Sequence, residues 1–372
     1  MGYSALNDHV TTDTGVYERS YFFSANRPLY TASAKFTGGL MITANSSVNI
    51  YSLPDSVYRN YQYNTMDVWV GFNFRNQFKN TGLKSNKPNL ALLFKQYNSN
   101  FTHRPWQPIY KDNPNYNDNH YFLSEFALFH QDFFKTNYFF GFGKTEDIPS
   151  GYNASATFGL SEWVLRQRTY SAVEAQKYWL TPRDNLFSTS VALGSFFYNG
   201  QPEDAVLHLQ ANFYSNLWRL RESKFRQFFT VDYLNCLNPV LYKPLNINRD
   251  NGILGYRNTT LNGYQRVNLS SQTTLYSPMM VYGFKFNFYS LLQASMLSNS
   301  QENIFKSPFY SSVGLGVNIR NENLSFNTLQ ISASYLPPVS GAPNSYFIQV
   351  TSTSAISFNI FGLTEPRLIP YR

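Results

Sequence analysis

Charged residues are scarce in this sequence. Lys, Arg, Asp and Glu make up 14% of the 372 residues, whereas a soluble globular domain contains about 25%. The mean hydropathy is nevertheless polar, at −0.36, because uncharged Asn, Ser, Thr and Gln take the place of the missing charges. This combination is unusual both for a soluble protein and for a helical membrane protein.

Long apolar runs are also absent from the sequence. No stretch approaches the roughly 20 consecutive apolar residues of a membrane-spanning helix. The first residues, Met1 to His9, lack the basic and apolar regions of a secretory signal. If the protein is exported, we therefore expect this sequence to be a mature chain or a fragment whose N-terminus has been removed.

Cysteine and clusters of basic residues are missing as well. Cys236 is the only cysteine, which excludes an intrachain disulfide and a cysteine metal cluster. The net charge is +8, but the 30 basic residues are spread along the chain. Nucleic-acid binding would require Lys/Arg clusters, so we expect no nucleic-acid partner. Solvated surfaces explain the charge, and contact with anionic lipid headgroups is a plausible addition.

Aromatic residues, by contrast, are abundant: the chain has 33 Phe and 29 Tyr. This content argues against disorder, because disordered chains are poor in aromatics. A transmembrane β-barrel has this mixture, since one face of each strand meets lipid, the other meets water, and aromatic girdles lie at both interfaces. The five Trp residues are expected in these girdles: Trp69, Trp106, Trp163, Trp179 and Trp218.

Apolar and polar residues alternate along much of the chain, which predicts β-strands. Such runs occur at 68–74, 154–160, 205–213, 284–288, 313–320, 329–335 and 356–360. Segments rich in Asn, Pro, Gly and Asp predict loops at 80–89, 104–119, 243–252 and 337–344. Since spanning strands take roughly 9–11 residues, sixteen strands fit this length, and twelve or fourteen with longer loops also fit. We predict an all-β fold, a single antiparallel up-and-down barrel over residues 1–372.

Several motifs in the second half of the chain carry a family likeness. They are Gly252-Ile-Leu-Gly-Tyr256 with Arg257, Gly263-Tyr-Gln-Arg266, the strand from Val267 to Pro278, and Ser312 to Val317. This part of the chain resembles the barrel of the BamA/TamA-type outer-membrane assembly factors (bacterial surface antigen barrels), in a divergent branch. The resemblance implies sixteen strands with a weak lateral seam between the first and last. We expect the barrel domain without the POTRA modules that usually precede it, since 372 residues leave no room for them.

Two positions depart from the family pattern. The loop-motif Arg is replaced by Leu254, and the acidic residue with which it pairs aligns with Ser290. Losing one end of a buried ion pair would cost roughly 3–5 kcal/mol, whereas losing both can be nearly neutral. Because both ends of the pair are lost together, the alignment is supported. The same loss weakens the inference that this chain shares the family's activity of inserting proteins into the membrane. Arg257 could restore part of the contact.

Catalytic motifs are not evident. The five His residues show no metal-binding spacing, and there is no Gly-x-Ser-x-Gly elbow. We therefore expect no enzyme, no metal and no cofactor. The segment Thr145 to Gly151 is interpreted as a turn between two strands, with Pro149 and Gly151 shaping it; Glu146 and Asp147 could alternatively dock a basic partner or a divalent ion.

Other polar residues are predicted to line the barrel lumen. Arg166 and Arg168 alternate with Tyr170 on one strand face, which should be the lumen, because Arg on the lipid face costs roughly 2–4 kcal/mol. They are expected to meet Glu162 or another acid. The further lumen candidates are His208, Ser290 and Arg320.

Three functions remain open from the sequence. The first is non-covalent assembly or translocation of outer-membrane proteins or lipids, in which the seam pairs with an incoming client strand. The second is a passive pore or transporter. The third is an anchor or exporter for an enzymatic domain outside this sequence. In each case the expected location is the bacterial outer membrane. The expected contacts are the lipid bilayer and lipopolysaccharide, with client barrels or periplasmic proteins as possible partners.

Overall fold

Alternating sequence runs form strands throughout the computed structural model of this chain. The structure describes residues 2–7, 17–28, 34–74, 88–139, 141–143, 145–248, 252–253, 255–256, 261–321, 328–339, 345–353 and 363–371. The first ten strands are β1 (Gly2–Asn7), β2 (Tyr17–Arg27), β3 (Phe36–Val48), β4 (Gln62–Asn73), β5 (Asn89–His103), β6 (Asn119–Asn137), β7 (Thr145–Trp163), β8 (Arg166–Leu180), β9 (Leu186–Tyr198) and β10 (Gln201–Tyr214).

The second half continues the same pattern. Its strands are β11 (Trp218–Leu220), β12 (Ser223–Leu237), β13 (Leu245–Asn246), β14 (Asn262–Gly263), β15 (Gln265–Val281), β16 (Phe284–Ser298), β17 (Phe309–Asn321), β18 (Thr328–Leu336) and β19 (Ser345–Thr353). Three short 3-10 helices lie in loops: η1 (Pro108–Tyr110), η2 (Pro114–Tyr116) and η3 (Ile304–Lys306).

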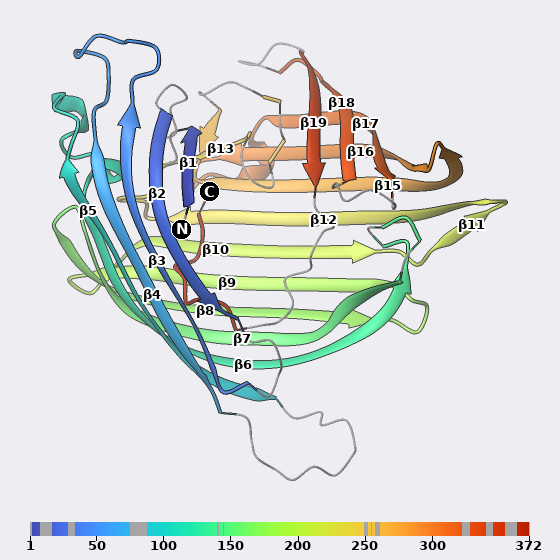
Figure 1. Ribbon diagram of the computed structural model, residues 1–372, viewed down its shortest axis with the longest axis horizontal. Coiled ribbons are helices and arrows are strands. Elements are labelled where there is room, and N and C mark those ends of the chain that lie inside the picture. Colours follow the sequence, from blue (N-terminus) through green and yellow to red (C-terminus); the bar gives the residue numbers. More distant parts are fainter. Residues whose placement is uncertain are drawn as a thin grey trace.

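Sixteen of these strands form one antiparallel up-and-down sheet, as predicted. Each pairs with its neighbours in sequence, from β1–β2 through β10–β12 and β12–β15 to β18–β19. The short β11 extends the hairpin with β12, and β13 pairs only with β14. The sheet curls strongly, with β1 and β19 at its two edges (Figure 1). In the described residues these edges do not pair, so the sheet is curved but not closed.

The convex face of the sheet is apolar and exposed. Because side chains alternate between the faces of a strand, the register places these residues together from β6 to β19. Soluble monomers rarely expose contiguous apolar patches larger than a few hundred Å², and this array crosses most of the sheet. Its members include Phe126, Phe158, Leu160, Val173, Leu193, Leu209, Val231, Leu269, Leu292, Leu315, Ile348 and Val350.

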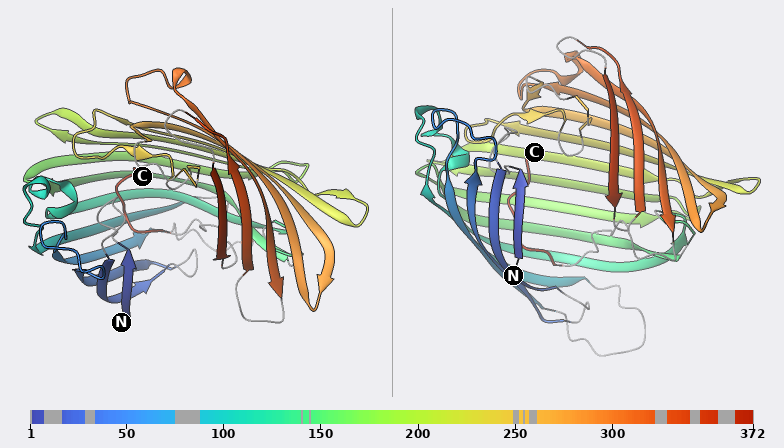
Figure 2. Two further views of the ribbon diagram at one scale, coloured as in Figure 1. Left: turned by 90° about the horizontal axis from the view of Figure 1, so that it is seen from above. Right: turned by 45° about the horizontal axis from the view of Figure 1, so that its top comes forward.

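The concave face is polar and much more buried. It carries charged or amide side chains on most strands, among them Lys95, Arg168, Asp204, Arg226, Asp232, Arg266 and Asn268. Two chain segments lie within the concavity: the described residues of the connection between β12 and β15, and residues 363–371 near the C-terminal marker (Figure 2). The concavity is therefore partly filled.

Several sequence predictions need correction. The segment Thr145 to Gly151 is not a turn: it forms the first part of β7 and pairs with β6, and the connection precedes it at 138–144. Trp69 is not a girdle residue, because it lies on the concave face beside Lys95 and packs against an inner cluster. The predicted strand at 356–360 and most of the predicted loop at 80–89 lie outside the described residues.

Candidate functional site on the concave face

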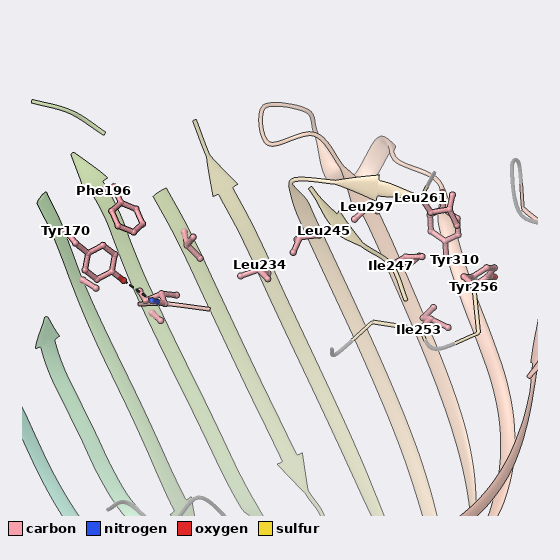
Figure 3. Packing of buried hydrophobic residues seen from close by; sticks show 14 of the residues in the cluster. Tyr170, Phe196, Leu234, Leu245, Ile247, Ile253, Tyr256, Leu261, Leu297 and Tyr310 are labelled. Atoms are coloured by element: carbon pink, nitrogen blue, oxygen red, sulfur yellow. Dashed lines mark hydrogen bonds between the residues drawn. The ribbon is translucent and has the colours of Figure 1, made fainter. Parts of the chain in front are cut away.

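The described residues of the connection between β12 and β15 (238–248, 252–253, 255–256 and 261–264), called the inner connection, fold back onto the inner face of β15 to β18. Ile253 and Tyr256 are buried beside Tyr310 (Figure 3), in a cluster that also contains Leu336. The Tyr256 hydroxyl lies 3.0 Å from the Ser311 carbonyl oxygen and 3.2 Å from that of Pro337. The motif that the sequence analysis singled out is thus anchored to the strands nearest the β19 edge.

Gly255 allows this close approach. Its φ of +111° is a conformation that residues with a side chain rarely adopt. A Cβ there would lie 2.9 Å from the Cβ of Phe347 on β19. The Gly255 N–H donates to the Asn248 side-chain oxygen at 2.8 Å, which holds the bend. Gly252 is buried beside it, while Leu254 and Arg257 lie outside the described residues.

Ser290 does not face the concavity. It shares a strand face with Phe288 and Leu292, both exposed on the convex side, and pairs in register with Leu315. The predicted lumen position is therefore wrong, because alternation along β16 turns Tyr289 inward instead, where its hydroxyl accepts from the Gln330 side chain at 2.7 Å. Ser290 cannot replace an inward-facing acid.

Arg166 and Arg168 do lie on the concave face, as predicted, but their acids come from β10. The Arg168 guanidinium donates to the Asp204 carboxylate at 2.6 Å, and both side chains are fully buried. Arg166 pairs with Glu203 at 3.0 Å, so the acids that the two arginines meet are Glu203 and Asp204 rather than Glu162, the other alternative of the prediction. The ring of Phe196 lies 4.1 Å from the Arg168 guanidinium carbon.

Asp204 was not among the predicted site residues. Its other carboxylate oxygen accepts from the backbone N–H groups of Val240, Leu241 and Tyr242 at 2.6, 3.0 and 3.1 Å. Its φ of +48° accompanies a register shift between Glu203 and Val206. The available signal was the Asn199-Gly200 hairpin turn followed by two acids. Asp204 ties β8 to the start of the inner connection.

The remaining candidates are separate from this cluster. His208 faces the concavity and lies 2.8 Å from the Asp232 carboxylate. Arg320 shares the inner face of β17 with buried Tyr310 and Ser312. Glu146 accepts from the backbone N–H groups of Phe139 and Gly141, which lie in the connection before β7.

The acidic segment has a structural role in this geometry. Asp147 is exposed opposite Lys135, Pro149 is buried, and Gly151 has a φ of +130°. A Cβ at Gly151 would overlap the His130 carbonyl oxygen, so glycine is needed there. Within the described ranges, no three His, Cys, Asp or Glu side chains gather as a metal site.

Residues 363–371 run along the concave face in an extended path. Most of its side chains contact the wall or are buried: Leu363, Glu365, Pro366, Arg367, Leu368, Ile369 and Tyr371. A cavity of about 840 Å³ lies beside this segment and is lined by polar residues that include Asp67, Glu125, Glu174, His208 and Gln210. Sequence patterns did not identify this segment as part of the site.

Burial sets the protonation of two tyrosines in the inner connection. It raises the pKa of the Tyr242 hydroxyl and of the Tyr256 hydroxyl above their ordinary value. Both groups therefore stay neutral and act through hydrogen bonds and ring contacts. No helix in the described part of the chain is long and apolar enough to cross a membrane.

A comparison of the chain with protein-family models and with curated protein sequences finds no match.

Proposed function

We propose that this chain is an outer-membrane β-barrel related to the BamA/TamA-type assembly factors. The carrying observation is the exposed apolar convex face of the sixteen-stranded sheet. Exposure of this apolar surface to water would cost about 25 cal/mol per Å², whereas contact with lipid would remove that cost. Polar residues on the opposite face match the lumen of such a barrel.

A bilayer also requires the two sheet edges to meet. In hydrocarbon, each unsatisfied backbone N–H or C=O costs several kcal/mol, so β1 and β19 would close the barrel by pairing. In the described residues these two strands do not pair with each other, whereas every other neighbouring pair of the sheet does. This supports a seam between β1 and β19 that is weaker than the other strand pairings and can open.

The proposed activity is non-covalent. An opened seam offers unpaired backbone groups to an incoming client strand, which adds to the sheet edge by β-augmentation. The packing of Gly255 and Tyr256 near β18 and β19 supports this idea, because it couples the inner connection to the last strands. Lipid and lipopolysaccharide are the expected contacts of the convex face, and unfolded barrel proteins are the expected clients.

The seam can be tested by locking it. Cysteine pairs with one residue in 2–7 and one in 345–353 are introduced into a Cys236→Ser background, and the oxidised protein is placed in lipid vesicles. We expect the unlocked protein to accelerate the folding of a small urea-denatured outer-membrane barrel and the disulfide-locked protein not to do so. Reductant should restore the acceleration. Equal rates for locked, unlocked and empty vesicles would overturn the assembly function.

A passive pore is the second candidate, because the concave face is polar and holds a cavity of about 840 Å³. It predicts that the wild-type protein conducts ions across a bilayer when its passage is open, and that it has no effect on client folding. The two candidates therefore differ in their effect on client folding.

A further inference from the structure

We propose that residues Leu363–Tyr371 are a releasable plug that occupies the lumen and closes its passage. The inference rests on the proposed barrel, but it adds a regulatory element that either candidate function would use. It is carried by three sets of contacts along the segment, at its start, centre and end.

The most specific contact is that of Ile369 with the space above Gly194, called the Ile369 seat. Ile369 is buried over Gly194, where a Cβ would lie 2.8 Å from the Ile369 Cδ1 atom and 2.7 Å from the Tyr170 hydroxyl. Ala172 lies beside this position in the same cluster. The Ile369 N–H donates to the Tyr170 hydroxyl at 2.8 Å. The small residues on β8 and β9 thus leave room for one branched side chain of the segment.

Apolar contacts also hold the two ends of the segment. Leu363 packs in a pocket of buried residues from β5 and β6 that includes Leu93 and Phe129. Tyr371 stacks on Tyr242, with ring centroids 5.5 Å apart, and its hydroxyl donates to the Tyr264 carbonyl oxygen at 3.0 Å. The segment therefore reaches from the middle of the sheet to the inner connection.

The centre of the segment is held more weakly. Glu365 pairs with Lys95 at 3.1 Å and Arg367 with Glu174 at 3.6 Å, and the side chains of Glu365 and Arg367 are about half exposed. Exposed ion pairs contribute little. Lys95 also pairs with Asp67 at 2.8 Å, so release of the segment leaves no lone cation on the wall. The two ion pairs at the centre can therefore separate at low cost, which favours a releasable plug over a permanent part of the core.

Release would join the segment's volume to the neighbouring cavity. Five of the residues that line that cavity belong to the segment itself, namely Leu363, Thr364, Glu365, Arg367 and Pro370. Opening then becomes an equilibrium between docked and undocked states that point substitutions can shift.

The test measures single-channel currents of the full chain in planar bilayers. Ile369→Ala empties the seat, and Arg367→Glu places a carboxylate against Glu174. We expect each to raise the open fraction about tenfold. Glu174→Arg combined with Arg367→Glu should return it toward the wild-type value. Arg219→Glu is the control, because it makes the same charge change as Arg367→Glu at an exposed position of β11 that does not line the cavity.

The outcomes separate the plug from the barrel. Heat-modifiable electrophoretic migration and bilayer insertion report barrel formation independently of current. If all variants insert, and if Ile369→Ala and Arg367→Glu conduct as the wild type and Arg219→Glu do, the plug is wrong and the barrel stands. An increase in Arg367→Glu that Glu174→Arg does not reverse would overturn the assignment of Glu174 as the contact of Arg367 in the docked plug. Failure of the wild type to migrate as a barrel or to insert would overturn both proposals.

Discussion

Asp204 shows how one buried carboxylate can organise the inner face. It joins a buried guanidinium on β8 to three backbone N–H groups of the inner connection. The four contacts to the Asp204 carboxylate, at 2.6 to 3.1 Å, offset part of the desolvation of the two charges. Removing one partner leaves the other without compensation, so the pair is costly to break.

Asp204→Ala should therefore destabilise the protein by about 3–5 kcal/mol, measured as the free energy of unfolding by urea in lipid vesicles. Asp204→Asn should lose less, because an amide oxygen can still accept from the backbone and Asn tolerates the positive φ. Arg104→Ala, which breaks an exposed pair with Asp118, should cost less than about 1 kcal/mol. Equal losses for Asp204→Ala and Arg104→Ala would contradict the buried network.

At the scale of the strand, the face on which a side chain lies determines how well a charged substitution is tolerated. Leu209 and Gln210 are neighbours in β10, but Leu209 is exposed on the convex face and Gln210 lines the inner cavity. Leu209→Arg should cost about 2–4 kcal/mol in a bilayer, whereas Gln210→Arg should be tolerated. Unfolding in lipid vesicles measures both. If Gln210→Arg destabilised the protein and Leu209→Arg did not, the assignment of the two faces of β10 would be wrong.

Strand faces were largely readable from the sequence, and their exceptions have physical causes. Alternation placed 205–213 and 313–320 correctly within β10 and β17. The inward position expected for Ser290 came from the family resemblance. Alternation with the neighbouring Phe288 and Leu292, which lie two residues away on either side, places Ser290 on the convex face. It failed at 145–151, because Pro149 and Gly151 signal a turn locally, yet pairing with β6 makes that segment a strand.

The inner segment was missed for a different reason. Residues 363–371 contain two prolines and no long alternating run, so nothing local predicts where they pack. Their position depends on Gly194, Leu93 and Tyr242, which are distant in sequence and come together only when the sheet curls. Contacts of this kind require the fold.

For the whole molecule, the central claim is that the curled sheet is a barrel with lipid outside and water inside. A nitroxide scan over residues 207–212 of β10, in a Cys236→Ser background in lipid vesicles, tests it directly. We predict that oxygen accessibility peaks at Leu207, Leu209 and Ala211, and that accessibility to a water-soluble nickel chelate peaks at His208, Gln210 and Asn212. The opposite phase, or oxygen and nickel profiles that rise and fall together, would contradict the membrane barrel.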